Sequence, residues 1–80
     1  MDNKTQSLDT VSQGETVQVV SLQGGKTARQ RLNQMGIHAG DTLFVSRSSV
    51  MAGPLLIRVH GMEVALGKGI AHKVEVSKSA

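Results

Sequence analysis

The segment from residue 55 to residue 66 constrains the fold of this chain most strongly. Apolar side chains alternate on both sides of His60-Gly61, and two turn-forming residues between alternating runs predict a tight β-hairpin. The predicted pairs are Val59 with Met62, Ile57 with Val64, Leu55 with Leu66 and Arg58 with Glu63. This register places the apolar residues on one face, and a shift by one residue would turn them to the other face. Two antiparallel strands are therefore expected here.

The rest of the sequence is typical of a small all-β domain. Short valine-rich runs are separated by turns that use nine glycines and one proline, as in folds built from several short strands. Further strands are predicted over Thr16–Leu22, Thr42–Arg47 and Lys73–Val76, and helical turns over residues 7–11 and 68–72. The alternation within Thr16–Leu22 is imperfect, which indicates partial burial on both faces. Five short strands around one hydrophobic centre favour a closed or half-open barrel, because closure removes exposed strand edges.

In the segment from residue 26 to residue 35, the spacing of apolar residues changes from that of a strand to that of a helix. Ala28, Leu32 and Met35 are spaced four and three apart, which predicts the buried face of an α-helix, and Gly36 is a typical helix stop. The opposite face carries basic and amide side chains, namely Lys26, Arg29, Gln30, Asn33 and Gln34, with Arg31 at the boundary. The sequence therefore predicts one helix with a basic surface.

Composition argues against several classes of protein. The chain has 80 residues and no cysteine, so one small domain is expected, without disulfides or cysteine-ligated zinc. The formal net charge is +3 and Phe44 is the single aromatic residue, whereas proteins that bind single-stranded nucleic acid stack bases on several aromatic rings. The sequence shows no signal-peptide pattern and no apolar run of membrane-spanning length. We expect a soluble, cytoplasmic protein that binds no nucleic acid and does not insert into a membrane.

Catalytic and metal-binding patterns are not recognisable in the sequence. No cysteine nucleophile, serine–histidine–carboxylate pattern or carboxylate pair indicates an enzyme. His38, His60 and His72 are expected in a turn, a hairpin tip and a helical turn without repeated spacing, so no metal site and no cofactor are predicted. The run Gly24-Gly25-Lys26-Thr27 resembles the end of a phosphate-binding loop, but Val20 stands where the full motif requires glycine. We interpret this run as a turn between strand and helix.

The sequence contains several short motifs. Each one alone is weak evidence for a protein family, but their order and spacing together are more specific. The motifs are Leu8 with Gly14, Gly24-Gly25, Arg29-Gln30-Arg31-Leu32, Met35-Gly36-Ile37 with Gly40, Gly53-Pro54, Val59-His60-Gly61, and Ala65-Leu66 with Ala71. Together they resemble the FeoA family of ferrous iron transport proteins over about residues 8–76. The segment from Arg29 to Gly40 is the sharpest part of the resemblance.

The resemblance implies an SH3-like five-stranded barrel with one α-helix inserted after the first strand, and short helical turns. The expected organisation is a flexible tail over residues 1–7 and a FeoA-type domain over residues 8–77. The resemblance also implies a non-enzymatic accessory protein of bacterial ferrous iron uptake. Its implied partner is the cytoplasmic part of ferrous iron transport protein B, a membrane permease with a GTP-binding domain. The protein would be peripheral to the inner membrane only through this partner.

The partner-binding surface is predicted from residues that the core does not need. The candidate residues are Lys26, Arg29, Arg31 and Asn33 on the helix, with Met51 and Pro54 in the loop before the hairpin. Exposed methionines adapt to irregular partner surfaces, and loops often carry binding residues. Simple solvation of the helix is the plainer interpretation of its charges.

Two other functions stay open on the sequence alone. The same domain resembles the C-terminal SH3-like module of iron- and manganese-dependent repressors, so a metal-responsive module that senses ferrous iron is one alternative. A small nucleic-acid-binding barrel driven by the basic helix is the other, although aromatic stacking platforms are missing. The edge strands of a half-open barrel also leave self-association open.

Overall fold

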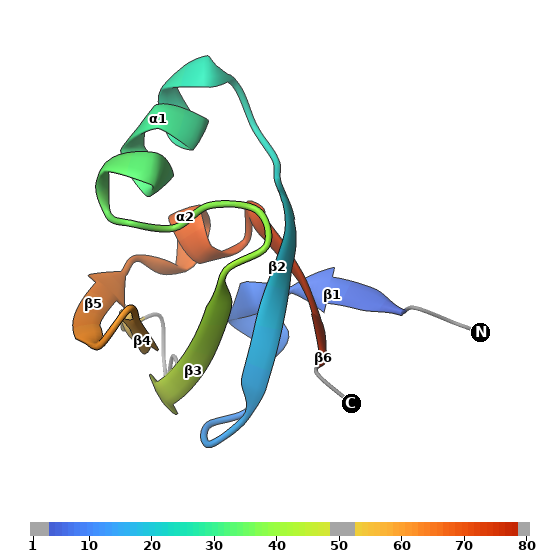
Figure 1. The fold of residues 1–80 in the computed structure, drawn as a ribbon, viewed down its shortest axis with the longest axis vertical. Coiled ribbons are helices and arrows are strands. Elements are labelled where there is room, and N and C mark those ends of the chain that lie inside the picture. The colour runs from blue at the N-terminus through green and yellow to red at the C-terminus, as the bar shows by residue number, and fades with distance from the viewer. Residues whose placement is uncertain (1–3, 49–52, 79–80) are drawn as a thin grey trace.

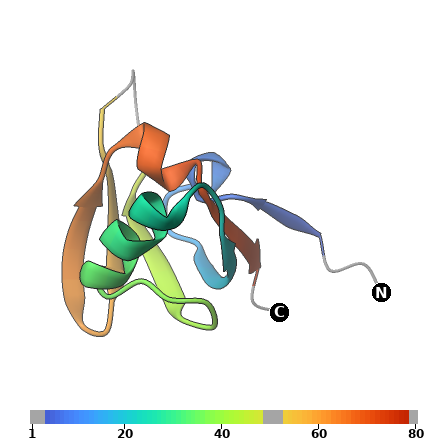
Figure 2. The ribbon, with the colours of Figure 1, turned by 90° about the horizontal axis from the view of Figure 1, so that it is seen from above.

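The computed structural model describes residues 4–48 and 53–78, which form a six-stranded antiparallel sheet in the order β1-β6-β2-β3-β4-β5 (Figure 1). The strands are β1 Thr5–Ser7, β2 Thr16–Leu22, β3 Thr42–Arg47, β4 Leu55–Val59, β5 Met62–Leu66 and β6 Val74–Lys78. The helical elements are the 3-10 turn η1 Leu8–Thr10, α1 Lys26–Gln34 and α2 Lys68–Ala71. Helices α1 and α2 lie next to each other (Figure 2). No helix within these segments has the length and hydropathy needed to cross a membrane.

The β4–β5 hairpin has the register predicted from the sequence. All the predicted cross-strand pairs are present, including Val59 with Met62 beside the turn. The turn residues His60 and Gly61 have φ angles of 52° and 76°, and a two-residue type I′ loop requires positive φ at both positions. The hairpin prediction is therefore confirmed, although the Met62 side chain at its tip is 66% exposed rather than buried.

The core is one cluster of aliphatic side chains. Strands β2, β3, β4, β5 and β6 supply Val17, Val19, Leu43, Val45, Leu55, Ile57, Val59, Leu66, Val74 and Val76, and the helices and loops supply Leu8, Val11, Leu32, Ile37 and Ala71. The strand residues alternate along the chain because successive side chains of a strand point to opposite faces. Burial of this one face fixes how the strands pair.

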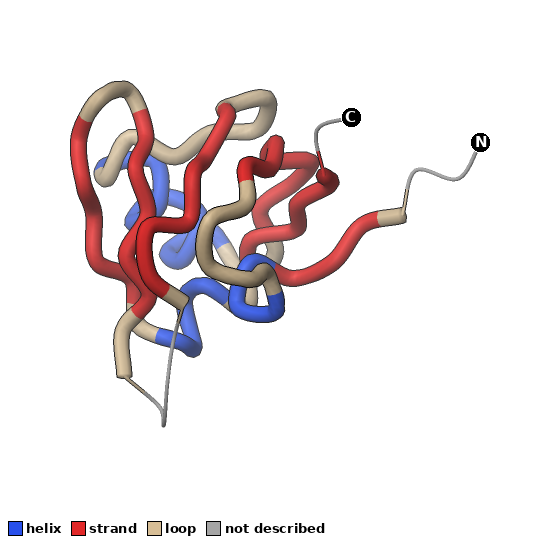
Figure 3. The backbone as a smooth tube through the Cα atoms, turned by 90° about the horizontal axis from the view of Figure 1, so that it is seen from below, coloured by secondary structure: helices blue, strands red, loops and turns tan. Residues whose placement is uncertain are grey.

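The sheet has six strands, whereas the sequence predicts five. The additional strand is β1, which pairs with β6 and extends away from the body of the domain (Figure 3). It lies within residues 1–7, the segment expected to be a flexible tail, so residues 5–7 belong to the sheet. The Thr5 hydroxyl donates a hydrogen bond of 2.6 Å to the Glu75 carboxylate. Residues 5–7 are polar and show no apolar alternation that would predict a strand. They form a strand because their backbone pairs with that of β6.

Within residues 4–48 and 53–78, hydrogen bonding does not close the strands into a ring. Among the described residues, β1 and β5 are the two ends of the sheet and do not pair with each other. The sequence predicts a closed or half-open five-stranded barrel, and an open strand order is compatible with the half-open form, which stays a prediction. An 80-residue domain is small enough for one open sheet to fold around its core, with helical elements covering the remaining apolar side chains.

Strand β2 contains an irregularity that its sequence pattern does not predict. Its register with β6 shifts between Val19 and Ser21, which makes Val20 the extra residue of a β-bulge. The Val20 side chain is 45% exposed. The imperfect alternation of this strand therefore reflects a bulge, and the expected burial on both faces is wrong at this position.

Helix α1 follows β2, where the change of apolar period predicts it. The helix ends at Gln34, and Gly36 has a φ angle of 88°, as expected for a helix-terminating glycine. The Ile37 amide donates a hydrogen bond of 3.0 Å to the Leu32 carbonyl, which completes the helix end. Leu32 is also the single fully buried residue of α1, so one side chain anchors the helix to the core.

The Leu32→Ala variant tests this anchoring. Truncating a fully buried leucine leaves a cavity, and we expect the free energy of unfolding to fall by about 3 kcal/mol. Urea denaturation followed by circular dichroism measures the change. The exposed Gln30→Ala variant on the same helix is the control and should differ little from the wild type. Equal stabilities of the Leu32→Ala variant and the control would contradict the anchoring role.

Candidate functional site

Helix α1 presents a group of basic side chains. Lys26, Arg29 and Arg31 are exposed, and the helix contains no acidic residue. None of the ion pairs among the described residues involves these three side chains. The helix can therefore offer its cations to an acidic surface without first breaking an internal ion pair.

A pocket of about 370 Å³ opens where α1 begins and α2 passes beside it. We call it the α1–α2 pocket, and its lining residues are Gly25, Lys26, Thr27, Ala28, Arg31 and Ile70. Ile70 belongs to α2, is half-buried and packs against the core. The pocket lining thus combines apolar side chains with two cations and one hydroxyl, which suits an acidic ligand that also carries an apolar group.

The structure brings together part of the predicted docking surface. Lys26 and Arg31 both line the α1–α2 pocket, whereas Arg29 and Asn33 are exposed on the same helix outside it. Pro54 lines a different hollow of about 320 Å³, whose other lining residues are Arg47, Ser48, Gly53 and Leu56. Met51 lies outside the described residues. The two hollows share no lining residue, so the helix and the loop are separate candidate surfaces.

Ile70 is the residue of this site that sequence reasoning missed. The sequence places it in a short helical turn, and a single isoleucine there carries no binding signal. Its position opposite the start of α1 results from the packing of α2 against the core. No local pattern could have paired residue 70 with residues 25–31.

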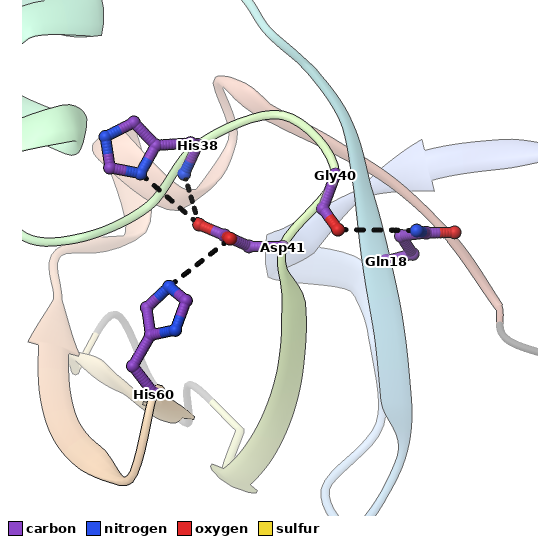
Figure 4. Close-up of polar contacts among 5 residues, drawn as sticks. All are labelled: Gln18, His38, Gly40, Asp41 and His60. Carbon is purple, nitrogen blue, oxygen red and sulfur yellow. Dashed lines mark hydrogen bonds and ion pairs between the residues drawn. The ribbon is translucent and has the colours of Figure 1, made fainter.

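A second polar cluster, which we call the Asp41 cluster, joins two turns (Figure 4). The Asp41 carboxylate accepts a hydrogen bond of 2.7 Å from the His38 amide. Its Oδ2 atom lies 3.4 Å from His38 Nδ1, and its Oδ1 atom lies 3.3 Å from His60 Nε2. The Gly40 amide donates to the Val19 carbonyl at 2.8 Å. Together these contacts fix the α1–β3 loop against both the hairpin tip and β2.

Opposing effects set the pKa of Asp41. Burial of its side chain raises the pKa, but the His38 amide and the two imidazoles favour the carboxylate and hold the pKa below its ordinary value of 3.8. Because the pKa of Asp41 is lower in the folded state, its carboxylate stabilises the fold at pH values above the pKa that the group has in the unfolded state. This contribution is lost as the pH falls through the lowered pKa.

The histidines do not converge on one point. His38 and His60 contact different oxygens of Asp41, while His72 Nδ1 lies 3.3 Å from Asp9 Oδ2 elsewhere in the fold. Within residues 4–48 and 53–78, no group of three histidine, aspartate or glutamate side chains is arranged to hold a metal ion. Each described histidine instead contacts a carboxylate.

The Asp41→Asn variant tests the Asp41 cluster. Near neutral pH we expect the free energy of unfolding to fall by about 1 kcal/mol, because the hydrogen bonds lose their charged acceptor. The difference from the wild type should shrink as the pH falls below 3.8, the ordinary pKa of this group. Thermal and urea unfolding across this pH range measure it. Glu63→Gln, at an exposed carboxylate on β5, is the matched control, and an equal effect there would contradict the interpretation.

A family model, a sequence relative and a solved structure all indicate the same family for this chain. A family model described as the FeoA domain matches residues 6–78. A Methanocaldococcus jannaschii protein named Fe(2+) transport protein A is 41% identical over 64 residues, which cover 80% of this chain and 76% of that protein. A crystal structure of a protein described as iron uptake regulatory protein FeoA superposes with a TM-score of 0.87 at 38% identity, over 95% of this chain and 99% of the other.

The fold also occurs in larger proteins. A manganese-dependent transcriptional repressor superposes with a TM-score of 0.89 at 19% identity, and the match covers 99% of this chain but 44% of the repressor. At this identity the likeness concerns the fold alone. The family model spans nearly the whole chain, and the Fe(2+) transport protein A relative shares its sequence over most of its length. The chain therefore belongs to the FeoA family.

Proposed function

We propose that this protein is a non-enzymatic accessory protein of ferrous iron uptake. It acts in the cytoplasm by binding the cytoplasmic part of the permease ferrous iron transport protein B. Membership of the FeoA family is the observation that carries this proposal. The relative from Methanocaldococcus jannaschii is named Fe(2+) transport protein A, and the similar crystal structure is of a protein described as an iron uptake regulatory protein.

The charge of α1 supports recognition of an acidic partner surface. Lys26, Arg29 and Arg31 lie on one short helix without an ion-pair partner among the described residues. Complementary charge raises the rate of association and selects the partner more than it raises affinity. The formal net charge of +3 has the same sign as this helix, so the long-range field also favours an acidic partner.

The way in which α1 is packed on the core supports docking of a partner on this helix. Because Leu32 is its single fully buried residue, almost all of the remaining helix surface is available for contact. A partner can cover this surface without displacing core side chains. Pro54 and Met51 stay a predicted second contact, since the hollow beside Pro54 is separate from the helix and Met51 lies outside the described residues.

A pull-down of the full-length permease in detergent tests the proposed function. We expect capture in at least one of the nucleotide-free, GDP-bound and GTP-analogue-bound states. The Arg29→Glu variant should weaken binding by about tenfold, because it reverses an unpaired charge at the docking helix. Arg58→Glu, with the same charge change at an exposed position on β4 that lines neither hollow, is the matched control and should bind like the wild type.

Different outcomes of these experiments test the docking surface and the proposed function separately. If the Arg29→Glu variant binds normally while a Met51→Asp variant does not, the loop rather than α1 is the docking surface. Failure of the wild-type protein to bind the permease in every nucleotide state would refute the proposed function. Unchanged ferrous uptake under iron limitation after deletion of the gene would refute it independently.

A further inference from the structure

The α1–α2 pocket has features that the charge of α1 alone does not explain. Its apolar part is formed by Ala28 and Ile70, which are both half-buried. Ile70 also packs against the core, so its position is fixed by the fold. The volume of about 370 Å³ lies near the lower limit of pockets that hold small ligands, which run from about 300 to 1,000 Å³. A pocket of this size suits one or two side chains of a protein.

We propose that the α1–α2 pocket anchors an acidic peptide segment of a protein partner. One aliphatic side chain of the segment packs on Ile70 and Ala28, and a neighbouring carboxylate pairs with Lys26 or Arg31. The identity of the partner rests on the proposed function, but the chemistry of the pocket does not. This inference goes beyond general attraction to a basic helix, because it requires an apolar side chain beside the acidic one.

Charge complementarity gives the occupant its acidic character. Lys26 and Arg31 line the pocket, and none of the described residues that line it is acidic. Neither side chain has an ion-pair partner among the described residues. An arginine guanidinium forms paired hydrogen bonds with a carboxylate, and the Thr27 hydroxyl supplies another polar group at the lining.

The apolar lining residues of the pocket favour a peptide over nucleic acid. Single-stranded nucleic acids are bound through their phosphates and through bases stacked on aromatic rings. No aromatic residue lines the α1–α2 pocket, and Phe44, the single aromatic residue of the chain, belongs to β3. Aliphatic groups such as Ile70 are better matched to a leucine, isoleucine or valine side chain of a partner.

Gly25 offers a way to fill the pocket without straining the backbone. It is the N-cap residue of α1, with φ −81° and ψ −177°, and a Cβ atom added there would meet no atom within 4 Å. Gly25→Leu therefore adds a side chain at the pocket lining. Gly67 is the N-cap residue of α2, has φ −62° and ψ 153°, and is equally open. It does not line the pocket, so Gly67→Leu is a matched control.

The test is an NMR titration of the full chain with a synthetic peptide in which one leucine is flanked on each side by two glutamates. We expect amide shifts centred on Gly25, Thr27, Arg31 and Ile70. Replacing the leucine by serine should weaken binding by about tenfold, because an apolar contact is lost. Replacing the glutamates by glutamines should weaken it by about fivefold, because ionic contacts are lost.

Variants of the protein complete the test. Gly25→Leu and Arg31→Glu should each weaken binding of the leucine peptide, while Gly67→Leu and Arg58→Glu should leave it unchanged. Equal binding of the serine peptide, shifts centred elsewhere, or normal binding by Gly25→Leu would overturn the proposal. Tighter binding of a short oligothymidylate at the same amides would also overturn it in favour of nucleic acid.

Failure of this inference is distinguishable from failure of the proposed function. If the permease captures wild type and Gly25→Leu equally, the pocket is not the anchor, although the accessory role stands. If the peptide binds the pocket but the permease captures nothing, the pocket inference stands and the partner is a different acidic protein. The peptide titration and the permease pull-down therefore answer separate questions.

Discussion

Pairing of β2 along both of its edges is the constraint on which the rest of the structure depends. Strand β3 lies on one side of β2 and β6 on the other, so β2 joins the β4–β5 hairpin to the β1–β6 pair in a single sheet. The chain has no cysteine, and no disulfide can replace this connection. Val17 and Val19 of the same strand are buried. Sheet pairing and core packing therefore stabilise each other at the same place.

The small size of the domain explains why one helix is left so exposed. A domain of this length buries only about 60% of the surface of its unfolded chain, and most of its buried side chains come from the sheet. Helix α1 contributes Leu32 alone to the fully buried set. As a result, one fully buried side chain holds the helix to the core, and its basic side chains stay exposed. For the same reason, Ile70 is only half-buried where α2 passes the start of α1.

The two ends of α1 are held differently. After the C-terminal end, the Asp41 cluster and the hydrogen bond from the Gly40 amide to the Val19 carbonyl tie the following loop to the hairpin and to β2. The N-terminal end begins at Gly25, whose missing side chain leaves open space beside the α1–α2 pocket. The C-terminal end is therefore held by several contacts, whereas the N-terminal end has open space beside it.

The sequence by itself determined the elements whose pattern is local. The hairpin register, the period of α1 and the cations Lys26 and Arg31 could be predicted because the residues concerned lie within a few positions of one another. Only the tertiary structure decided the pairing of β1 with β6, the contact of Ile70 with the α1 pocket and the meeting of Asp41 with His60. These contacts join segments far apart in the chain. They form only when the shared apolar core brings those segments together, and no local periodicity encodes that packing.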